Sequence, residues 1–330
     1  MMGKIYHSIS ELVGHTPLLE LGNYENKYHL KTEILAKLEY FNPNQSTKDR
    51  IAKIMIEEAE KEGKIKPGDT LVETTSGNTG IAEAAIAAAK GYKYQVYIQD
   101  QVSRERYKVI HAFGGETIPF STVPEIKKVL EDTKGDFMAA SNYLKEHKLR
   151  KDHTKFFLDQ AANPKNSSAH RKTTGPEIWD DTDGNIDILI ATVGTGGTLS
   201  GTGEYLKFQN PSIQIIGVQP GPHSLPSVEQ PQPEYEITGI HPFIDVPDDH
   251  IPPVLDRDIY DEVITVEGDS ATETTREIAK EEGILVGTSS GAALYAALQV
   301  ARRPENEKKR IVVIFPDTGL RYLSTNLFDE

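Results

Sequence analysis

Short apolar runs alternate with longer amphipathic runs along most of the chain. Nine segments from residue 33 onward have the length and β-branched content of buried strands. They cover residues 33–39, 70–74, 94–99, 115–120, 155–160, 187–193, 213–219, 262–266 and 310–315. Between them, apolar residues at helical spacing occur in 51–63, 103–115, 271–283 and 290–302. The alternation predicts doubly wound α/β architecture with mostly parallel sheets and helices on both faces.

One stretch breaks this pattern. Residues 219–256 are rich in proline and show little periodicity. Because strands resume after them, we expect a long ordered loop rather than a linker. A chain of 330 residues exceeds one ordinary domain, so the length predicts two domains or one large α/β unit.

The composition narrows the classes of function. The net charge of -14 argues against a nucleic-acid partner, because phosphate binding requires a basic surface. The absence of cysteine excludes disulfides, thiolate metal sites and cysteine nucleophiles, and we expect no metal. No apolar run is long enough to cross a bilayer, and the start of the chain lacks a signal-type apolar segment. We therefore expect a cytoplasmic protein with no membrane contact.

The stretch NPNQSTKDR places Lys48 at the start of a predicted helix. A helix N-terminus has partial positive charge and favours acidic residues, so a lysine is electrostatically misplaced there. An exposed lysine of no consequence is one interpretation. The other is that burial and cationic neighbours keep the amine deprotonated and nucleophilic, as a Schiff-base lysine requires. This motif alone leaves both open.

Open parallel sheets bind ligands beyond the carboxyl ends of their strands. The strand at 70–74 runs into TTSGNTG and an alanine-rich helix, which brings hydroxyls and backbone N–H groups to a positive helix end. That combination suits a carboxylate or a phosphate. The strand at 187–193 runs into GTGGT at 194–198, whose glycines let backbone amides approach an anion. Leu199 breaks the dinucleotide fingerprint and no Walker A lysine follows, so we expect a phosphate but neither a dinucleotide nor a triphosphate.

Two further junctions are less specific. GILVGTSSGAA at 283–293 places hydroxyl residues ahead of a helix, where capping and ligand binding are equally good interpretations. Asp317 lies in the turn PDTG, for which a turn role is favoured over a site role.

These motifs resemble one known family when taken together. NPNQSTKDR, TTSGNTGI, QAANP…TTGPEIW, VGTGGTLSGTG, GILVGTSSGAA and FPDTGLRYLST occur in the order and spacing of the cysteine synthase (O-acetylserine sulfhydrylase) and cystathionine β-synthase family, over nearly the whole chain. The resemblance implies fold type II of the pyridoxal 5′-phosphate (PLP) enzymes, which is tryptophan synthase β-like. It implies an N-terminal domain of residues 1–12 and 36–154 and a C-terminal domain of residues 13–35 and 155–330.

The resemblance also assigns roles to residues. Lys48 would form the Schiff base with PLP and act as general base, and Asn78 would meet the ring hydroxyl oxygen. Ser289 would meet the pyridine nitrogen, where a neutral partner leaves the ring a weaker electron sink than a carboxylate would. The 5′-phosphate would bind to Gly194, Thr195, Gly196, Gly197 and Thr198. The substrate carboxylate would bind to Thr75, Ser76, Gly77 and Thr79, with Gln160 in reach.

The implied reaction is β-replacement on an activated serine, most simply O-acetyl-L-serine plus sulfide giving L-cysteine and acetate. The substrate side departs from the family, which typically has Gln-Phe where this chain has Gln160-Ala161 and QGIGAG where it has residues 238–243. Two alternatives keep the chemistry with other substrates: condensation with homocysteine, as in cystathionine β-synthase, or desulfhydration of cysteine, which releases hydrogen sulfide. A more remote one is a non-catalytic regulatory homologue.

The expected partners follow from the same resemblance. They are a small amino-acid substrate, a sulfur nucleophile and a second copy of the chain in a homodimer. A serine acetyltransferase is a further candidate partner. No arginine stands at Thr238, which argues against a phosphorylated serine as donor.

Overall fold

The chain folds into two compact units. The computed structural model describes residues 5–75, 77–100, 102, 104–133, 137–225 and 233–329, with only the backbone of 137 and 138. The first unit comprises residues up to Val13, Asn42–Asn44 and Lys48–Lys165, and the second comprises Gly14–Phe41, Gln45–Thr47 and the chain from Asn166 onward.

The second unit is built on a six-stranded sheet with strand order β1-β2-β10-β7-β8-β9. Only β1 is antiparallel to its neighbour; the other pairings are parallel. The strands are β1 (Leu18–Glu20), β2 (Glu33–Leu38), β7 (Ile188–Thr192), β8 (Gln214–Pro220), β9 (Glu262–Val266) and β10 (Arg310–Phe315). The helices are α1 (Gly22–Lys27), α7 (Lys165–Lys172), α8 (Thr174–Asp181), α9 (Gly197–Gln209), α10 (Gly268–Glu282) and α11 (Thr288–Ala301).

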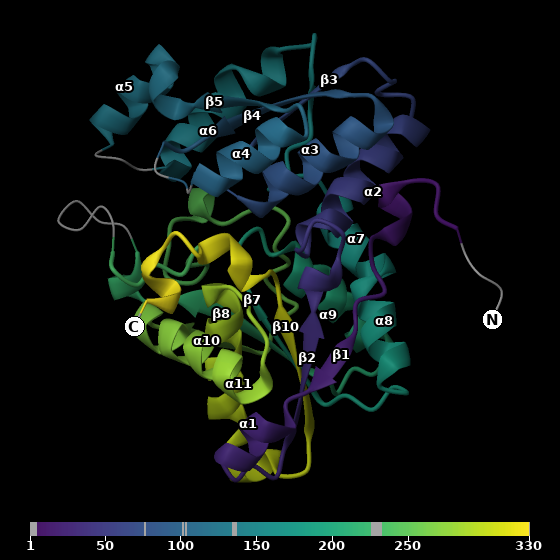
Figure 1. The fold of residues 1–330 in the computed structure, drawn as a ribbon, viewed down its shortest axis with the longest axis vertical. Coiled ribbons are helices and arrows are strands. Elements are labelled where there is room, and N and C mark those ends of the chain that lie inside the picture. Colours follow the sequence, from purple (N-terminus) through teal and green to yellow (C-terminus); the bar gives the residue numbers. More distant parts are fainter. Residues whose placement is uncertain are drawn as a thin grey trace. The chain divides into compact units, whose positions relative to one another are not determined.

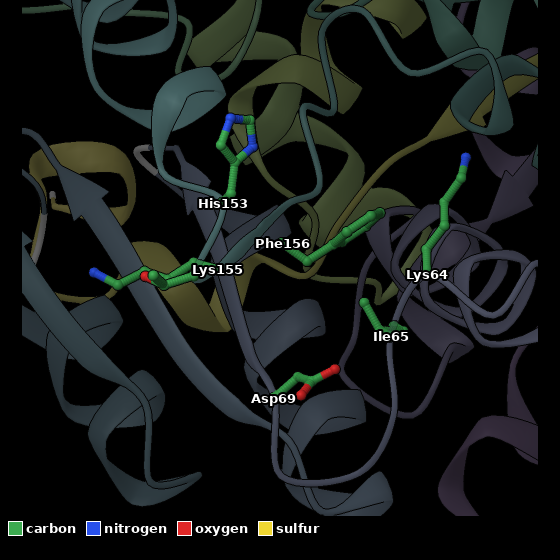
Figure 2. Close-up of a pocket in the computed structure, with 7 residues that line it drawn as sticks. Lys64, Ile65, Asp69, His153, Lys155 and Phe156 are labelled. Atoms are coloured by element: carbon green, nitrogen blue, oxygen red, sulfur yellow. The ribbon is translucent and has the colours of Figure 1, made fainter.

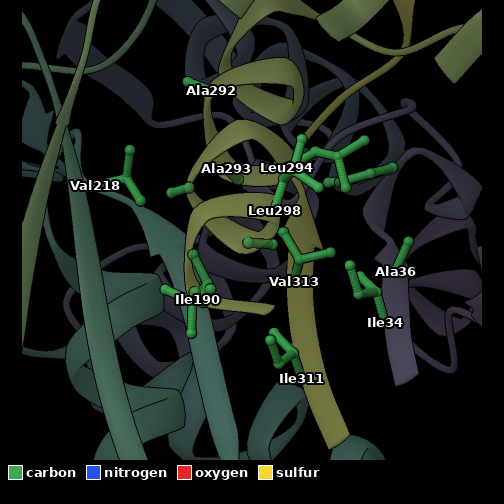
Figure 3. Close-up of a cluster of buried hydrophobic side chains, with 14 of the residues drawn as sticks. Ile34, Ala36, Ile190, Val218, Ala292, Ala293, Leu294, Leu298, Ile311 and Val313 are labelled. Carbon is green, nitrogen blue, oxygen red and sulfur yellow. The ribbon is translucent and has the colours of Figure 1, made fainter. Parts of the chain in front are cut away.

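Both faces of this sheet are buried, which explains its uninterrupted apolar strands. Along β10, Ile311, Val313 and Phe315 pack on one face with α10 and α11, whereas Val312 and Ile314 pack on the other. The first face is shown in Figure 3, where alanines and leucines of α11 lie against β7, β8 and β10. The opposite face is covered by α8 and α9 (Figure 1).

The first unit repeats the design on a smaller, entirely parallel sheet with order β5-β4-β3-β6. Its strands are β3 (Thr70–Thr74), β4 (Lys93–Ile98), β5 (Glu116–Pro119) and β6 (Phe156–Phe157). Its helices are α2 (Lys48–Lys61), α3 (Asn78–Lys90), α4 (Arg104–Ala112), α5 (Pro124–Asp132) and α6 (Phe137–His147). Apolar residues of α5 and α6 cover one face, and α3 covers the other.

The predicted doubly wound α/β fold with mostly parallel sheets is confirmed, and each predicted strand is present. The strand expected at 155–160 is cut to two residues, because Asp159 takes a left-handed conformation with φ of 54° and turns the chain away. The short antiparallel β1 was missed. Of the proline-rich stretch 219–256, residues 226–232 lie outside the described residues, and after β8 the rest forms turns and single 3-10 turns. No described helix combines the length and apolar character needed to cross a membrane.

The division into two compact units does not test the domain boundaries expected from the sequence, and those boundaries stay a prediction. The units keep β2 whole within the second unit, whereas the expected boundary at residue 36 falls inside that strand. They also extend the first unit through Lys165.

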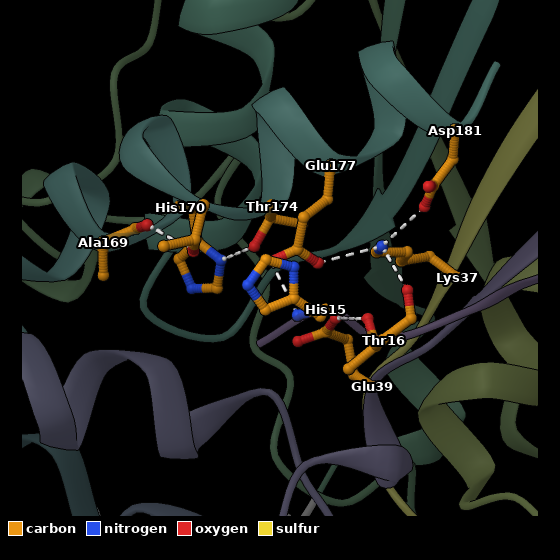
Figure 4. Close-up of polar contacts among 10 residues, drawn as sticks. His15, Thr16, Lys37, Glu39, Ala169, His170, Thr174, Glu177 and Asp181 are labelled. Atoms are coloured by element: carbon orange, nitrogen blue, oxygen red, sulfur yellow. Dashed lines mark hydrogen bonds and ion pairs between the residues drawn. The ribbon is translucent and has the colours of Figure 1, made fainter. Parts of the chain in front are cut away.

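A buried lysine joins β2 to the segment before β1. Lys37 has no exposed side-chain surface, and its Nζ donates to the Thr16 carbonyl oxygen at 2.5 Å. The same Nζ lies 3.0 Å from Glu177 and 3.5 Å from Asp181 of α8 (Figure 4). A buried ammonium is tolerated only when it is paired in this way.

We expect Lys37→Ala to lower the free energy of unfolding by about 3 kcal/mol, because it leaves the Glu177 carboxylate without its buried partner. Lys31 provides a matched control, since its pair with Glu307 is exposed on both sides. Lys31→Ala should cost less than about 1 kcal/mol. Urea unfolding of both variants measures the difference, and equal losses would contradict the prediction.

Candidate active site

Lys48 is the first residue of α2, as the sequence predicts. The residues before it are tied to the end of β10: the Thr47 N–H donates to the Pro316 carbonyl at 2.8 Å, and Ser46 pairs with Asp317. The acidic residue that a helix start favours is Asp49, whose carboxylate accepts the Asn44 N–H at 2.7 Å. Lys48 itself is half-buried. Asp49 thus supplies the acidic residue of the first turn and ties the helix start to the turn at Asn44.

The loop after β3 lies at the carboxyl edge of the smaller sheet. We call residues 74–79 the carboxylate loop; Ser76, a predicted substrate contact, lies outside the described residues. Gly77 is the N-cap of α3 and has no side chain with which to cap that helix. The Gly77 N–H lies 3.3 Å from the Thr75 hydroxyl oxygen. Asn78 begins the helix and is half-buried.

Gln160 belongs to this loop in space, although it is distant in sequence. Its Oε1 accepts the Thr79 hydroxyl at 2.6 Å, and its Nε2 lies 3.5 Å from the Thr74 carbonyl oxygen. The structure therefore brings together Thr75, Gly77, Thr79 and Gln160, as predicted for a carboxylate site. The N–H groups of a helix start and hydroxyls are suitable donors for such an anion.

In the second unit, residues 194–198 form a loop between β7 and α9, which we call the phosphate cup. Each of its three glycines is packed too closely for a side chain. A Cβ on Gly194 would lie 2.4 Å from the Gly239 carbonyl oxygen, one on Gly196 2.6 Å from Leu255, and one on Gly197 1.9 Å from Asn166 Oδ1. Gly196 also has a φ of 84°, which disfavours any other residue. The backbone is thus left bare at the start of a helix whose N-cap has no side chain.

Two residues of α7 support the hydroxyls of the cup. Asn166 Nδ2 donates to the Thr195 hydroxyl at 3.0 Å, and the Thr198 hydroxyl lies 3.2 Å from His170 Nε2. His170 Nδ1 lies 2.9 Å from the Thr174 hydroxyl. Both Asn166 and His170 are buried. Sequence reasoning missed them, and no local motif distinguishes them from other polar residues of a helix.

Ser289 lies in the first turn of α11 and is buried. The hydroxyls on either side, Thr288 Oγ1 and Ser290 Oγ, are buried without a hydrogen-bond partner among the described residues. Gly287 precedes them, and a Cβ there would lie 2.2 Å from Asp317 Oδ1. The Asp317 carboxylate accepts the Tyr322 hydroxyl at 2.8 Å, which favours the structural role predicted for Asp317.

A family model described as "Pyridoxal-phosphate dependent enzyme" matches residues 9–317. The chain belongs to this family of enzymes. A cysteine synthase of Staphylococcus aureus is 41% identical over 99% of both chains. An O-acetylserine sulfhydrylase of Entamoeba histolytica has a TM-score of 0.85 at 35% identity, over 100% of this chain and 93% of that one. A hydrogen sulfide-producing enzyme of Fusobacterium nucleatum has a TM-score of 0.82 at 37% identity, over 98% and 99%.

These similarities place the PLP-dependent enzyme in the cysteine synthase family and confirm PLP as its cofactor. The phosphate cup fits the cofactor's phosphate, since three close-packed glycines bare the backbone and two threonines supply hydroxyls at a helix N-terminus. Ser289 and its neighbours Thr288 and Ser290 are neutral hydroxyl residues, which fits an unprotonated pyridine nitrogen. Among the described residues, no cluster of metal-ligating side chains occurs.

A pocket in the first unit is separate from these residues. It has a volume of about 390 Å³ and is lined by Lys64, Ile65, Asp69, His153, Thr154, Lys155 and Phe156 (Figure 2). Asp69 immediately precedes β3, so the pocket lies at the amino edge of the sheet, opposite the carboxylate loop. Lys64 and Lys155 already pair with Glu62 and Asp152, which reduces the positive charge available to an anion.

The packing of Gly197 yields a prediction for the PLP-dependent enzyme. Gly197→Ala places a methyl group against Asn166 Oδ1. We expect this overpacking to cost about 2 kcal/mol of binding free energy, which weakens PLP binding about thirtyfold. Gly22→Ala is the control, because nothing lies within 4 Å of a Cβ there. Titration of the apoprotein with PLP, followed by visible absorbance, measures the affinity. Unchanged affinity in Gly197→Ala would contradict the assignment of the cup.

Proposed function

We propose that this enzyme is a cysteine synthase that converts O-acetyl-L-serine and sulfide into L-cysteine and acetate. The 41% identity to a cysteine synthase over 99% of both chains is the observation that supports it most directly. In the reaction, the bond between the β carbon and the acetoxy oxygen breaks, acetate leaves with the electron pair, and a bond from sulfur to the β carbon forms.

The proposed roles follow the sequence motifs. Lys48 would hold PLP covalently, Asn78 would bond its ring hydroxyl oxygen, Ser289 would face its pyridine nitrogen, and the cup would bind its phosphate. When bound, PLP supplies an electron sink for the electrons released as the α-proton leaves. The Lys48 amine takes that proton as general base and later returns it to the α carbon.

The carboxylate loop would orient the amino acid. Its hydroxyls and the N–H groups at the start of α3 would bind the α-carboxylate, with the Gln160 amide beside them. Fixing the carboxylate fixes the α carbon, so that its proton faces the Lys48 amine.

A second candidate function is release of hydrogen sulfide from cysteine. The similarity to the hydrogen sulfide-producing enzyme and the small residue at Ala161 favour it. The small side chain also leaves condensation with homocysteine as a third candidate. All three use the same lysine and loop and differ in the leaving group and nucleophile.

Assembly and location are proposed on the family resemblance alone. We propose a homodimer in the cytoplasm, with serine acetyltransferase as a candidate partner. Residues 238–243 would affect the binding of that partner, because they replace the small residues that line the site in cysteine synthases.

The function and the lysine are tested together. Wild-type protein should form cysteine from O-acetylserine and sulfide, and Lys48→Ala should lose both the visible absorbance of lysine-bound PLP and at least about 1,000-fold of the rate, since it lacks the base and the covalent anchor. Lys53→Ala, on the same helix, should retain both.

Either of two results would overturn these assignments. A Lys48→Ala protein that keeps the visible absorbance rules out Lys48 as the anchor. A wild-type protein that releases sulfide from cysteine but forms none from O-acetylserine establishes the second candidate instead.

Ala161 is expected to set the size of acceptor that the site admits. Ala161→Phe adds a phenyl group and should lower kcat/KM for homocysteine by about tenfold or more, while that for sulfide changes less than about threefold. Ala162→Phe, one residue away, controls for general disruption of the turn. Equal losses on both acceptors would contradict the idea.

A further inference from the structure

A fully buried glutamate lies at the carboxyl end of β3, directly before the carboxylate loop. Glu73 has no exposed surface. Its Oε1 accepts the Thr74 N–H at 2.7 Å, and its Oε2 accepts the Gln160 N–H at 2.9 Å. A carboxylate that is ionised is acceptor-only, so two N–H donors on its two oxygens match that form.

These bonds continue into the loop through Gln160. The Gln160 backbone is held by Glu73, and its side chain accepts the Thr79 hydroxyl at 2.6 Å. The Gln160 amide nitrogen also points back to the Thr74 carbonyl oxygen. Glu73 therefore links two segments far apart in sequence, the end of β3 and the turn at 159–161.

We propose that Glu73 is a positioning residue for the amino-acid substrate, which fixes Gln160 against Thr79 so that the carboxylate loop is preorganised. This inference rests on the proposed function of the loop as the site of the substrate carboxylate. Preorganised donors bind an anion more tightly because less ordering is left to occur on binding.

The surroundings of Glu73 make the strength of its hydrogen bond to the Gln160 N–H depend on pH. The titratable and charged groups around it are Glu83 of α3, Tyr94 of β4, Lys145 of α6 and Asp159, which pairs with Arg150. Burial, above all, raises the pKa of Glu73 to about 8, with the N–H donors opposing the shift.

Glu83 provides a matched comparison in the same environment. It is also fully buried, and its Oε2 accepts the Tyr94 hydroxyl at 2.7 Å. Its Oε1 has no partner among the described residues, which suits a protonated oxygen. Burial, and then the nearby Glu73, hold the pKa of Glu83 well above its usual range. Both effects favour the neutral form of Glu83.

The direction of the pH effect follows from these states. As the pH rises through about 8, Glu73 ionises and its oxygen becomes a stronger acceptor of the Gln160 N–H. Stability changes in the opposite sense. An unfolded glutamate ionises near pH 4.5, so the raised pKa favours the folded state fully below that pH, and this contribution is lost as the pH rises to about 8.

The test compares Glu73→Gln with wild type as holoenzymes. Each is titrated with L-alanine, which has the same α-carboxylate but no β leaving group, and binding is followed by visible absorbance at about pH 6.5 and pH 9. Glutamine is neutral at both pH values and has only one acceptor oxygen. We expect binding to be about tenfold weaker than wild type at pH 9, and the ratio to shrink towards one at pH 6.5, where wild-type Glu73 is also neutral.

Glu83→Gln is the control, because the Glu83 carboxyl bonds Tyr94 and not Gln160, and its ratio should stay close to one at both pH values. A Glu73→Gln ratio near one at pH 9, or one that does not change with pH, would overturn the proposal. Should Glu73→Gln fail to fold, Glu73→Asp applies: its shorter carboxylate withdraws from Gln160 and should weaken binding at pH 9, and wild-type affinity there would overturn the proposal. If the wild-type protein does not respond to O-acetylserine at any pH, the proposed function is contradicted and the role of Glu73 is not the cause.

Discussion

Burial of the parallel strands on both faces is the constraint on which the rest of this structure depends. Because each strand must be apolar on both sides, polar side chains are displaced to the strand ends. The parallel register then brings the ends of β3, β4 and β6 to one edge of the smaller sheet, and those of β10, β7 and β8 to one edge of the larger sheet. The carboxylate loop follows β3 at one of these edges, and the phosphate cup follows β7 at the other.

Three fully buried ionisable side chains, those of Lys37, Glu73 and Glu83, differ in how their charge is compensated. Lys37 is compensated by a carbonyl oxygen and two carboxylates. Glu73 and Glu83 are compensated less completely, so burial raises the pKa of both. The difference is physical: an opposite charge at hydrogen-bond distance stabilises the charged form, whereas dipoles alone do not fully replace water. Glu73 accordingly can change its charge in a folded protein, and it does so beside the carboxylate loop.

The sequence predicts the architecture well because strand and helix patterns are local. It also predicts the cup, because the glycines at 194, 196 and 197 are recognisable in the sequence. The structure adds the reason for them: a Cβ on each of these glycines would lie within 2.6 Å of another atom. The sequence does not predict Asn166, His170 or Glu73. Their importance arises from contacts with Thr195, Thr198 and Gln160, which only the folded chain brings near. The site is therefore predictable where backbone shape decides it, and hidden where a distant side chain supports it.

The segment 238–243 shows the same contrast between backbone and side chains. The segment 238–243 keeps its path through backbone contacts, since the His241 N–H donates to the Val193 carbonyl at 2.9 Å and the Gly239 carbonyl packs on Gly194. Its side chains can change without disturbing the cup. Burial lowers the pKa of His241, so that its imidazole is neutral near pH 7. Together with Thr238, this leaves the segment without a cation, and a donor that carries a phosphate would find no countercharge there. A donor whose β substituent is an uncharged ester, as in O-acetylserine, requires none, so the electrostatics of the segment agree with O-acetylserine as donor.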